Sequence, residues 1–392
     1  MQDMRTINAW AKLAVALAAL VAGAGPVRGA WEQGSVAMVD GVPWLYSVNA
    51  NGQAAILGGP GFGDVVIPSS IGCYPVTCIS NAAFLNCRGI TSVTIPASVK
   101  RIGNCAFEGC RGLASVTLPE GVADIGWCAF HDCIKLASIS IPSSVTNSLH
   151  AVFQRCTGLV SATLPDGMES VGPRMFWECT GLTSVTIPDS VTDIAQEAFS
   201  ECRKLVSVTI PNGVTNIGDG AFSRCAGLEE VTLPDSLASI GTGAFRMCNG
   251  LSSITIPAGV TNIGYEVCSG CRGLTRILVE PGNPSYASVD GVLFSKDMTN
   301  LMCCPGAKQG VYAVPDSVTH IDSSAFYGCR GLTAVTIPDS VTGIECGVFA
   351  YCDGLKTLRV PAAWKSKEVY GRFWSQSVWV PKGCTIVYGD GK

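Results

Sequence analysis

Charged residues are scarce in this chain of 392 residues, at 14% of the total. Soluble domains usually carry about 25% charged residues. Intrinsic disorder requires high charge and low hydrophobicity, and 47% of this chain is hydrophobic, so the composition excludes a disordered protein. Acidic residues outnumber basic ones by 30 to 26. The basic excess typical of nucleic-acid binders is therefore missing, and no nucleic-acid partner is expected.

Long hydrophobic runs are also missing, because no segment reaches the ~18 apolar residues that a membrane-spanning helix needs. The longest run, LAVALAALVAGAG, follows Arg5 and Lys12 and is itself followed by small residues. This order is typical of a secretory signal peptide, which we predict for residues 1–29. The alternative is an N-terminal membrane anchor. We expect an exported protein, secreted or at the cell surface, with no membrane span in its mature chain.

Histidine is rare, with only His131, His150 and His320. None stands beside a nucleophile motif, and the sequences G-x-S-x-G, H-E-x-x-H and the phosphate-binding P-loop do not occur. The C-S-G-C segment at 268–271 resembles a metal or redox motif, but no second pair of ligands completes a zinc set. We predict no catalytic residue, no metal site and no cofactor, and we expect a protein that is not an enzyme.

What the sequence does contain is a repeat of 23 residues. One unit, LTSVTIPDSVTDIAQEAFSEC, runs from Leu182 to Cys202, and its proline recurs every 23 residues from Pro96 to Pro257. Phenylalanine and cysteine recur with the same period, and we predict that they form two stacked columns in a core. The columns comprise Phe107, Phe130, Phe153, Phe176, Phe199, Phe222 and Phe245, and Cys110, Cys133, Cys156, Cys179, Cys202, Cys225 and Cys248.

Each unit has the L-x-x-V-x-I spacing of a leucine-rich repeat strand, which Pro188 ends in the unit quoted above. The segment AQEAFSEC places its Phe and Cys at i and i+3, which favours a short helical turn. One unit cannot bury its apolar side alone, so units must stack. The sequence predicts a leucine-rich repeat solenoid of α/β type, a right-handed superhelix of about 13 rungs. We expect its parallel β-sheet on the concave face and short helical turns on the convex side.

The pattern L-x-x-V-T-I-P-x-x-V-T-x-I-G-x-x-A-F-x-x-C-x-G-L resembles the BspA-type bacterial leucine-rich repeat. The resemblance covers about residues 64–361, which we predict to be the solenoid. It implies an exported or cell-surface protein, and some members of that family bind host matrix proteins or other cells.

The ends of the solenoid are predicted to be capped, because terminal repeats need a polar outer face. Residues 30–63 contain two apolar strands around Asn-Ala-Asn-Gly and are predicted to form an N-terminal β-hairpin cap. Residues 362–392 break the period and are predicted to form a C-terminal cap. They include the large aromatic residues Trp364, Phe373, Trp374 and Trp379.

One long repeat carries an insertion at about residues 280–314. Beside it, Cys268 stands where the phenylalanine column continues, so this rung lacks volume. We predict that Phe294 of the insertion, or Val267, fills the gap.

Twenty cysteines in an exported protein could form a disulfide framework. Eleven of them lie on the 23-residue period beside phenylalanine, where a small apolar filler is needed, and we interpret them as free core thiols. Off the period, Cys105 and Cys128 occupy the same place in adjacent units, and Cys73 and Cys78 are close in sequence. Each of these two pairs is a hypothetical disulfide.

Two surfaces are candidates for binding. Alternate strand residues should point outward, which makes one face of the sheet rich in hydroxyls. The candidate binding face comprises Ser184, Thr186, Ser207, Thr209, Glu230, Thr232, Ser253 and Thr255. Aromatic residues stand at otherwise polar places of the turn segment, and the candidate anchors are Trp127, Trp177, Tyr265, Tyr327 and Tyr351. The alternatives are a plain solvated sheet face and aromatic rings half-buried against neighbouring turns.

The sequence thus predicts an exported, non-enzymatic repeat protein that binds an extracellular protein or glycan, as in adhesion to a host or matrix. The alternatives are a passive spacer module of a surface layer and a glycan-binding module.

Overall fold

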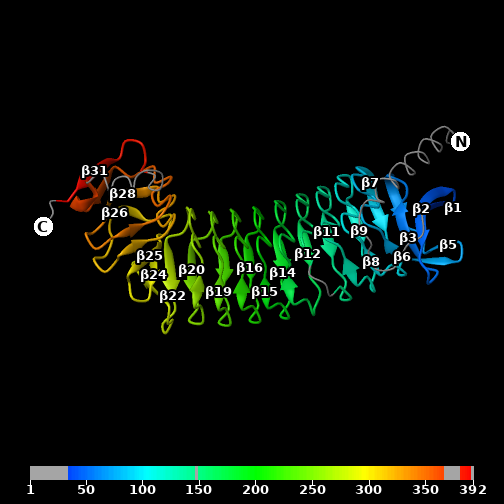
Figure 1. Ribbon diagram of the computed structural model, residues 1–392, viewed down its shortest axis with the longest axis horizontal. Coiled ribbons are helices and arrows are strands. Elements are labelled where there is room, and N and C mark those ends of the chain that lie inside the picture. Colours follow the sequence, from blue (N-terminus) through cyan, green and yellow to red (C-terminus); the bar gives the residue numbers. More distant parts are fainter. Residues whose placement is uncertain (1–33, 146–148, 366–379, 390–392) are drawn as a thin grey trace. The chain divides into compact units, whose positions relative to one another are not determined.

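The computed structural model describes residues 34–145, 149–365 and 380–389. The chain divides into two compact units, Met1–Leu159 and Val160–Lys392. In both units the repeats form successive solenoid turns, about 13 in the described chain, with parallel strands stacked from turn to turn (Figure 1). This confirms the predicted leucine-rich repeat solenoid. The predicted signal peptide and the cap residues Phe373, Trp374 and Trp379 lie outside the described residues.

Unit 1 begins with an antiparallel hairpin, in which β2 pairs with β1 and β3, and β3 then pairs in parallel with β6. Trp44 of β2 is buried and meets the ring of Phe84 edge-on, with the ring centroids 6.5 Å apart. The strands of this unit are β1 (Ser35–Val39), β2 (Val42–Val48), β3 (Ala54–Gly58), β4 (Phe62–Val66), β5 (Ser70–Ile71), β6 (Tyr74–Ile79), β7 (Gly89–Thr94), β8 (Arg101–Ile102), β9 (Ser115–Thr117), β10 (Asp124–Ile125) and β11 (Ser138–Ser140).

Unit 2 contains most of the regular turns and the insertion, and in its last described part Trp364 is buried in the same core cluster as Phe349. Its elements are β12 (Ser161–Thr163), β13 (Ser170–Val171), β14 (Ser184–Thr186), β15 (Asp193–Ile194), β16 (Ser207–Thr209), β17 (Asn216–Ile217), β18 (Glu230–Thr232), β19 (Ser239–Ile240), β20 (Ser253–Ile256), β21 (Asn262–Ile263), β22 (Arg276–Val279), β23 (Tyr286–Val289), β24 (Val292–Ser295), β25 (Asn300–Cys303), β26 (Gln309–Ala313), β27 (His320–Ile321), β28 (Gly331–Thr336), β29 (Gly343–Ile344), β30 (Thr357–Val360), the 3-10 helix η1 (Ala362–Lys365) and β31 (Thr385–Tyr388).

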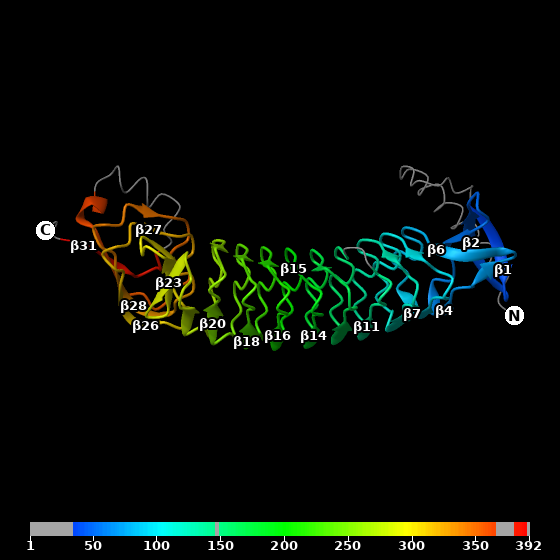
Figure 2. The same cartoon turned by 90° about the horizontal axis from the view of Figure 1, so that it is seen from below.

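Each regular turn contributes two strands. The predicted V-x-I strands stack in register, as β16 and β18 do with Val208 opposite Val231. A second column of two-residue strands was not predicted: β15 pairs with β17, with Ile194 opposite Ile217. The sequence indicates only a turn at these residues, because two residues show no periodicity of their own. Figure 2 shows β14, β16, β18 and β20 along one side of unit 2 and β15 on the opposite side.

The predicted short helical turns are the one detail of the fold that differs. Residues 34–145, 149–365 and 380–389 contain no α-helix. In the turn segment, backbone N–H groups alternate between local and inter-turn acceptors: Phe199 N donates to Ala221 O of the next turn, and Cys202 N to Phe199 O. An α-helix would use all of these donors within itself. Positive φ angles at Glu197 and Glu201, 54° and 62°, provide the alternation.

The predicted phenylalanine column is a stack of parallel rings, and all of its members are fully buried. In unit 2 the centroids of Phe199 and Phe222 are 5.3 Å apart and those of Phe222 and Phe245 are 5.5 Å apart. Phe107 and Phe130 stack in the same way in unit 1, at 5.3 Å. Aromatic rings at this separation attract one another when they are offset.

The predicted cysteine column is equally buried, and its thiols have a specific role. The Sγ of Cys202 donates to Phe176 O at 3.2 Å, and that of Cys225 donates to Phe199 O at 3.1 Å. The acceptor is the carbonyl 26 residues earlier each time. A buried carbonyl without a partner is costly, so a small side chain that also donates fits this place better than alanine.

The insertion forms antiparallel strands β23, β24 and β25, and β25 then pairs in parallel with β27 of the following turn. Phe294 is fully buried in a cluster with Leu301, Tyr312 and Phe326. Val267 is also buried. That one of these side chains replaces the ring missing at Cys268 stays a prediction, as do the boundaries of the caps.

Replacing Phe222 with alanine tests the ring column. Because Phe222 is stacked on both sides and fully buried, its loss should lower the free energy of unfolding by about 3–5 kcal/mol. Urea unfolding followed by circular dichroism measures this. The control is Val206→Ala on the same unit, where Val206 is 48% exposed and should change stability by less than about 0.5 kcal/mol. Equal effects of the two substitutions would contradict the stacked core.

The buried thiols predict loss of stability in alkali. Burial raises the pKa of Cys225 from 9.0 to about 12. Below pH 9 the thiol is protonated in both states, but above it the unfolded chain loses a proton that the folded chain keeps. Stability should therefore fall by about 1.4 kcal/mol per pH unit for each such thiol as the pH rises from about 9 towards 12.

Urea unfolding at about pH 8 and about pH 10.5 would measure the slope. Cys225→Ala is the matched variant. Its free energy of unfolding should fall less steeply with pH, because one fewer proton is released on unfolding. An identical slope in the variant would show that this thiol is not protected by the fold.

Candidate functional site

The face formed by the first strand column of unit 2 is the candidate site. In β14, β16 and β18 the outer residues are exposed, whereas the central valine points inward and is partly or fully buried. Side chains alternate across a strand, so the exposed serines and threonines stand on one face. Seven of the eight residues predicted for this face are exposed, and Ser253 is half-buried.

The strand register arranges these side chains in rows. Ser161 lies opposite Ser184, and Thr163 lies opposite Thr186. Farther along the unit, Glu230 replaces the hydroxyl opposite Ser207. Rows of short polar side chains offer hydrogen bonds to a partner at a small entropic cost.

A hollow of about 630 Å³ opens on this face around β18 and β20. Four predicted residues line it, Glu230, Thr232, Ser253 and Thr255, and three carboxylates from Glu229, Glu230 and Glu280 surround it without a lysine or arginine. The complete lining is Glu229, Glu230, Val231, Thr232, Leu233, Ser252, Ser253, Thr255, Pro257 and Glu280.

Glu280 is one of the six lining residues that sequence reasoning did not assign to the site, and it adds a carboxylate to the hollow. It stands where other repeats have the proline that ends the strand. Its Oε2 accepts a hydrogen bond from Ala258 N at 3.0 Å, which holds the carboxylate at the hollow. The sequence contains one signal for this residue, because an acidic side chain stands at a position where the other repeats have proline.

The predicted aromatic anchors differ in exposure. Trp127 in unit 1 and Tyr265 in unit 2 are 53% and 54% exposed, and Trp177 is half-buried. Within unit 2, the rings of Tyr327 and Tyr351 lie together, with centroids 5.0 Å apart.

Tyr327 lies within a small packed network. Arg246 covers its ring at 5.4 Å and forms an ion pair with Glu266, whose carboxylate also accepts from Ser324 Oγ at 2.7 Å. A cation over an aromatic ring stabilises the pair. The half-buried alternative for Tyr327 therefore holds, while Tyr351 remains 52% exposed.

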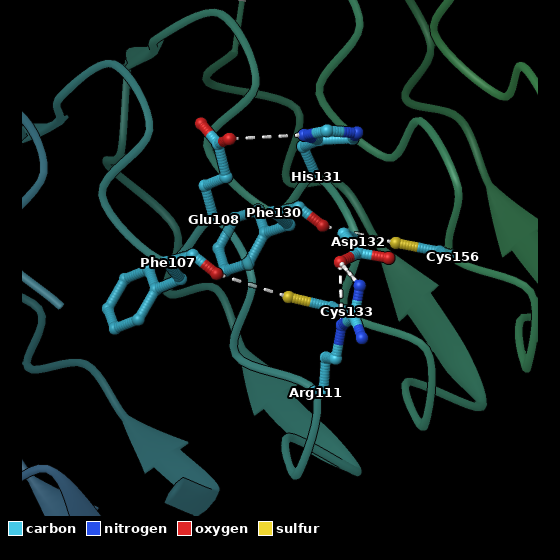
Figure 3. A network of polar contacts seen from close by, with 8 residues as sticks. All are labelled: Phe107, Glu108, Arg111, Phe130, His131, Asp132, Cys133 and Cys156. Carbon is cyan, nitrogen blue, oxygen red and sulfur yellow. Dashed lines mark hydrogen bonds and ion pairs between the residues drawn. The ribbon is translucent and has the colours of Figure 1, made fainter. Parts of the chain in front are cut away.

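In unit 1 a polar network joins adjacent turns (Figure 3). His131 Nδ1 lies 3.4 Å from the Glu108 carboxylate, and Arg111 pairs with Asp132 at 2.7 Å. Figure 3 also shows the Cys133 thiol donating to the carbonyl of Phe107. These contacts connect neighbouring turns and so stabilise the stack.

All twenty cysteines are free thiols in the structure. Neither hypothetical bridge is formed: Cys105 and Cys128 are separate, as are Cys73 and Cys78. Burial, then a hydrogen bond to Glu108, raises the pKa of Cys105 to about 12. Among the described residues, no three His, Cys, Asp or Glu side chains are placed to hold a metal ion.

These features agree with a comparison against protein families. The family model described as "BspA type Leucine rich repeat region (6 copies)" matches residues 77–202, 172–295 and 309–374, more than half of the chain. The chain belongs to the BspA-type leucine-rich repeat family. A search of curated proteins finds no match.

Solved structures of bacterial repeat proteins are similar to this BspA-type chain. A leucine-rich cell surface protein from Faecalibacterium prausnitzii A2-165 is 26% identical, with a TM-score of 0.53, 91% of this chain and 95% of that chain covered. A leucine-rich repeat protein from Bacteroides ovatus ATCC 8483 is 21% identical, with a TM-score of 0.49 over 93% and 100% of the two chains. A leucine-rich repeat protein from T. pallidum is 33% identical over 53% and 87%, with a TM-score of 0.41.

This BspA-type chain is thus a leucine-rich repeat protein of the bacterial surface-protein type. Family and fold are repeat modules that typically bind proteins and lack enzymatic activity. Across the described ranges of the chain, no helix has the length and apolar character of a membrane span.

Proposed function

We propose that this protein is exported and binds an extracellular protein through the strand face of unit 2. The observation that carries the proposal is the hollow on that face, which is lined by hydroxyls and three carboxylates. The partner we infer presents lysine or arginine side chains to the hollow.

The charge of the hollow supports a basic partner. Among the described residues, no lysine or arginine forms an ion pair with Glu229, Glu230 or Glu280. Uncompensated charge on a concave surface attracts opposite charge and speeds association. The serine and threonine rows beside it supply neutral hydrogen-bonding groups for the partner's backbone.

The location outside the cell is supported by the similar Faecalibacterium protein, which is described as a cell surface protein. The signal peptide predicted for residues 1–29 also supports a location outside the cell. Adhesion to a host, a matrix or another cell is the role that best fits an exposed binding face without catalytic groups.

Charge reversal tests the binding face. The double variant Glu229→Lys/Glu230→Lys should weaken binding by at least about tenfold, because it places positive charge where a basic partner docks. Binding to immobilised matrix proteins, mucins and whole bacterial cells would be measured at low and high salt. The control is Asp166→Lys/Glu169→Lys, which changes net charge equally at two exposed residues that do not line the hollow.

Several outcomes would count against this proposal. Equal binding by both double variants would show that the hollow is not part of the interface. Absence of binding to every matrix protein, mucin and cell tested would contradict adhesion. Loss of binding after removal of glycans would favour a glycan-binding module. Self-association in sedimentation without any foreign partner would favour a spacer of a surface layer.

The export part has its own test. If residues 1–29 are a signal peptide, the mature protein should begin at Ala30 and be recovered from the cell envelope or the medium. Fractionation followed by N-terminal sequencing measures both. An intact N-terminus in the envelope would indicate the anchor alternative, and recovery in the cytoplasm would contradict export.

A further inference from the structure

The turn at the insertion places a thiol where regular turns place a ring. In a regular turn the phenylalanine N–H donates to the carbonyl that precedes the next phenylalanine, as Phe199 N does to Ala221 O at 2.8 Å. Cys304 N makes the equivalent bond to Ala325 O, at 2.7 Å. Cys304 therefore holds the phenylalanine position of the turn that precedes Phe326.

The next column cysteine, Cys329, has a longer thiol bond than most of the column. The thiols of eight other column cysteines lie 2.9–3.3 Å from the carbonyl of the phenylalanine in the preceding turn. The Sγ of Cys329 lies 3.7 Å from Cys304 O and 3.6 Å from Pro305 O. Its thiol is thus placed against Cys304 without a strong acceptor.

The two thiols share one buried environment. Cys304 and Cys329 belong to the same core cluster and are 2% and 0% exposed. A hydrogen bond with the Cys304 thiol, followed by burial, raises the pKa of Cys329. Cys304 lies within the insertion, where the 23-residue period is interrupted, so the period does not pair it with Cys329 and only the fold brings them together.

We propose that Cys304 and Cys329 form a disulfide when the chain folds in the presence of a small-molecule disulfide oxidant, such as oxidised glutathione. The thiolate of one cysteine attacks a sulfur of the oxidant and releases one small thiol. The second cysteine then displaces the other small thiol from the mixed disulfide. Two protein thiols lose two electrons and two protons, and the oxidant is reduced to two thiols.

The bond would join the short turn of the insertion to the regular turn that follows. The other column cysteines are expected to stay reduced. Their thiols already donate to carbonyls at hydrogen-bonding distance and stack in the same direction, which suits disulfide geometry poorly. Because both partners are buried in the folded chain, the oxidation takes place during folding, when the two turns have come together but the oxidant still reaches the thiols.

The test is refolding of the full chain in a glutathione redox buffer, followed by thiol counting under denaturant and tryptic peptide mapping. Of the 20 cysteines, 18 should remain free, since the bond consumes two. The cross-linked product should join peptide 297–308 to peptide 309–330. Adding reductant should lower the urea concentration at the unfolding midpoint.

Three variants decide the pairing. Cys304→Ser and Cys329→Ser should each abolish the cross-link and leave all 19 remaining thiols free. Cys303→Ser is the matched control and should keep the cross-link, because Cys303 lies in the same tryptic peptide. Twenty free thiols in the wild type, or a cross-link that needs Cys303 or joins another cysteine, would overturn the proposal.

Discussion

The structure depends on the hydrogen bonds that pass from each turn to the next. Every second N–H of the turn segment leaves its own turn, as Phe199 N does to reach Ala221 O. Equivalent residues must therefore lie above one another at the spacing of parallel strands. Once that register is fixed, each position of the repeat becomes a column through the stack. A side chain in a buried column must pack against the side chain at the same position of the next turn.

This constraint explains the composition of the repeat. Phenylalanine stacks on phenylalanine, and the cysteine beside it satisfies a carbonyl of the preceding turn. The strand face has no neighbour to pack against, so hydroxyls suffice there and charge is optional. The overall charge is low because most positions of the repeat contact the next turn, and only a small share of them face water alone. The proposed binding face and the core thus have a common origin in the stack.

The proposed binding hollow and the proposed disulfide both lie at departures from the columns. Glu230 interrupts a row of hydroxyls, and Glu280 replaces a proline, so their carboxylates meet at one hollow. Cys304 replaces a ring, and the Cys329 thiol lies farther from its carbonyl acceptors, at 3.6–3.7 Å, than the thiols of regular turns do. In a repeat protein, a residue that breaks the period carries more information about function than one that keeps it.

The sequence by itself determined the solenoid, the strand with its outward hydroxyls, and the membership of the two core columns, because a fixed period forces equivalent residues into equivalent places. It could not show the second strand column or the absence of helical turns, since these depend on whether an N–H bonds within its turn or to the next one. Nor could it bring Glu280 to Glu230 or Cys304 to Cys329. The 23-residue period does not continue through the insertion, so it does not predict which residues are neighbours in this part of the chain. The contacts there depend on the tertiary packing around the insertion.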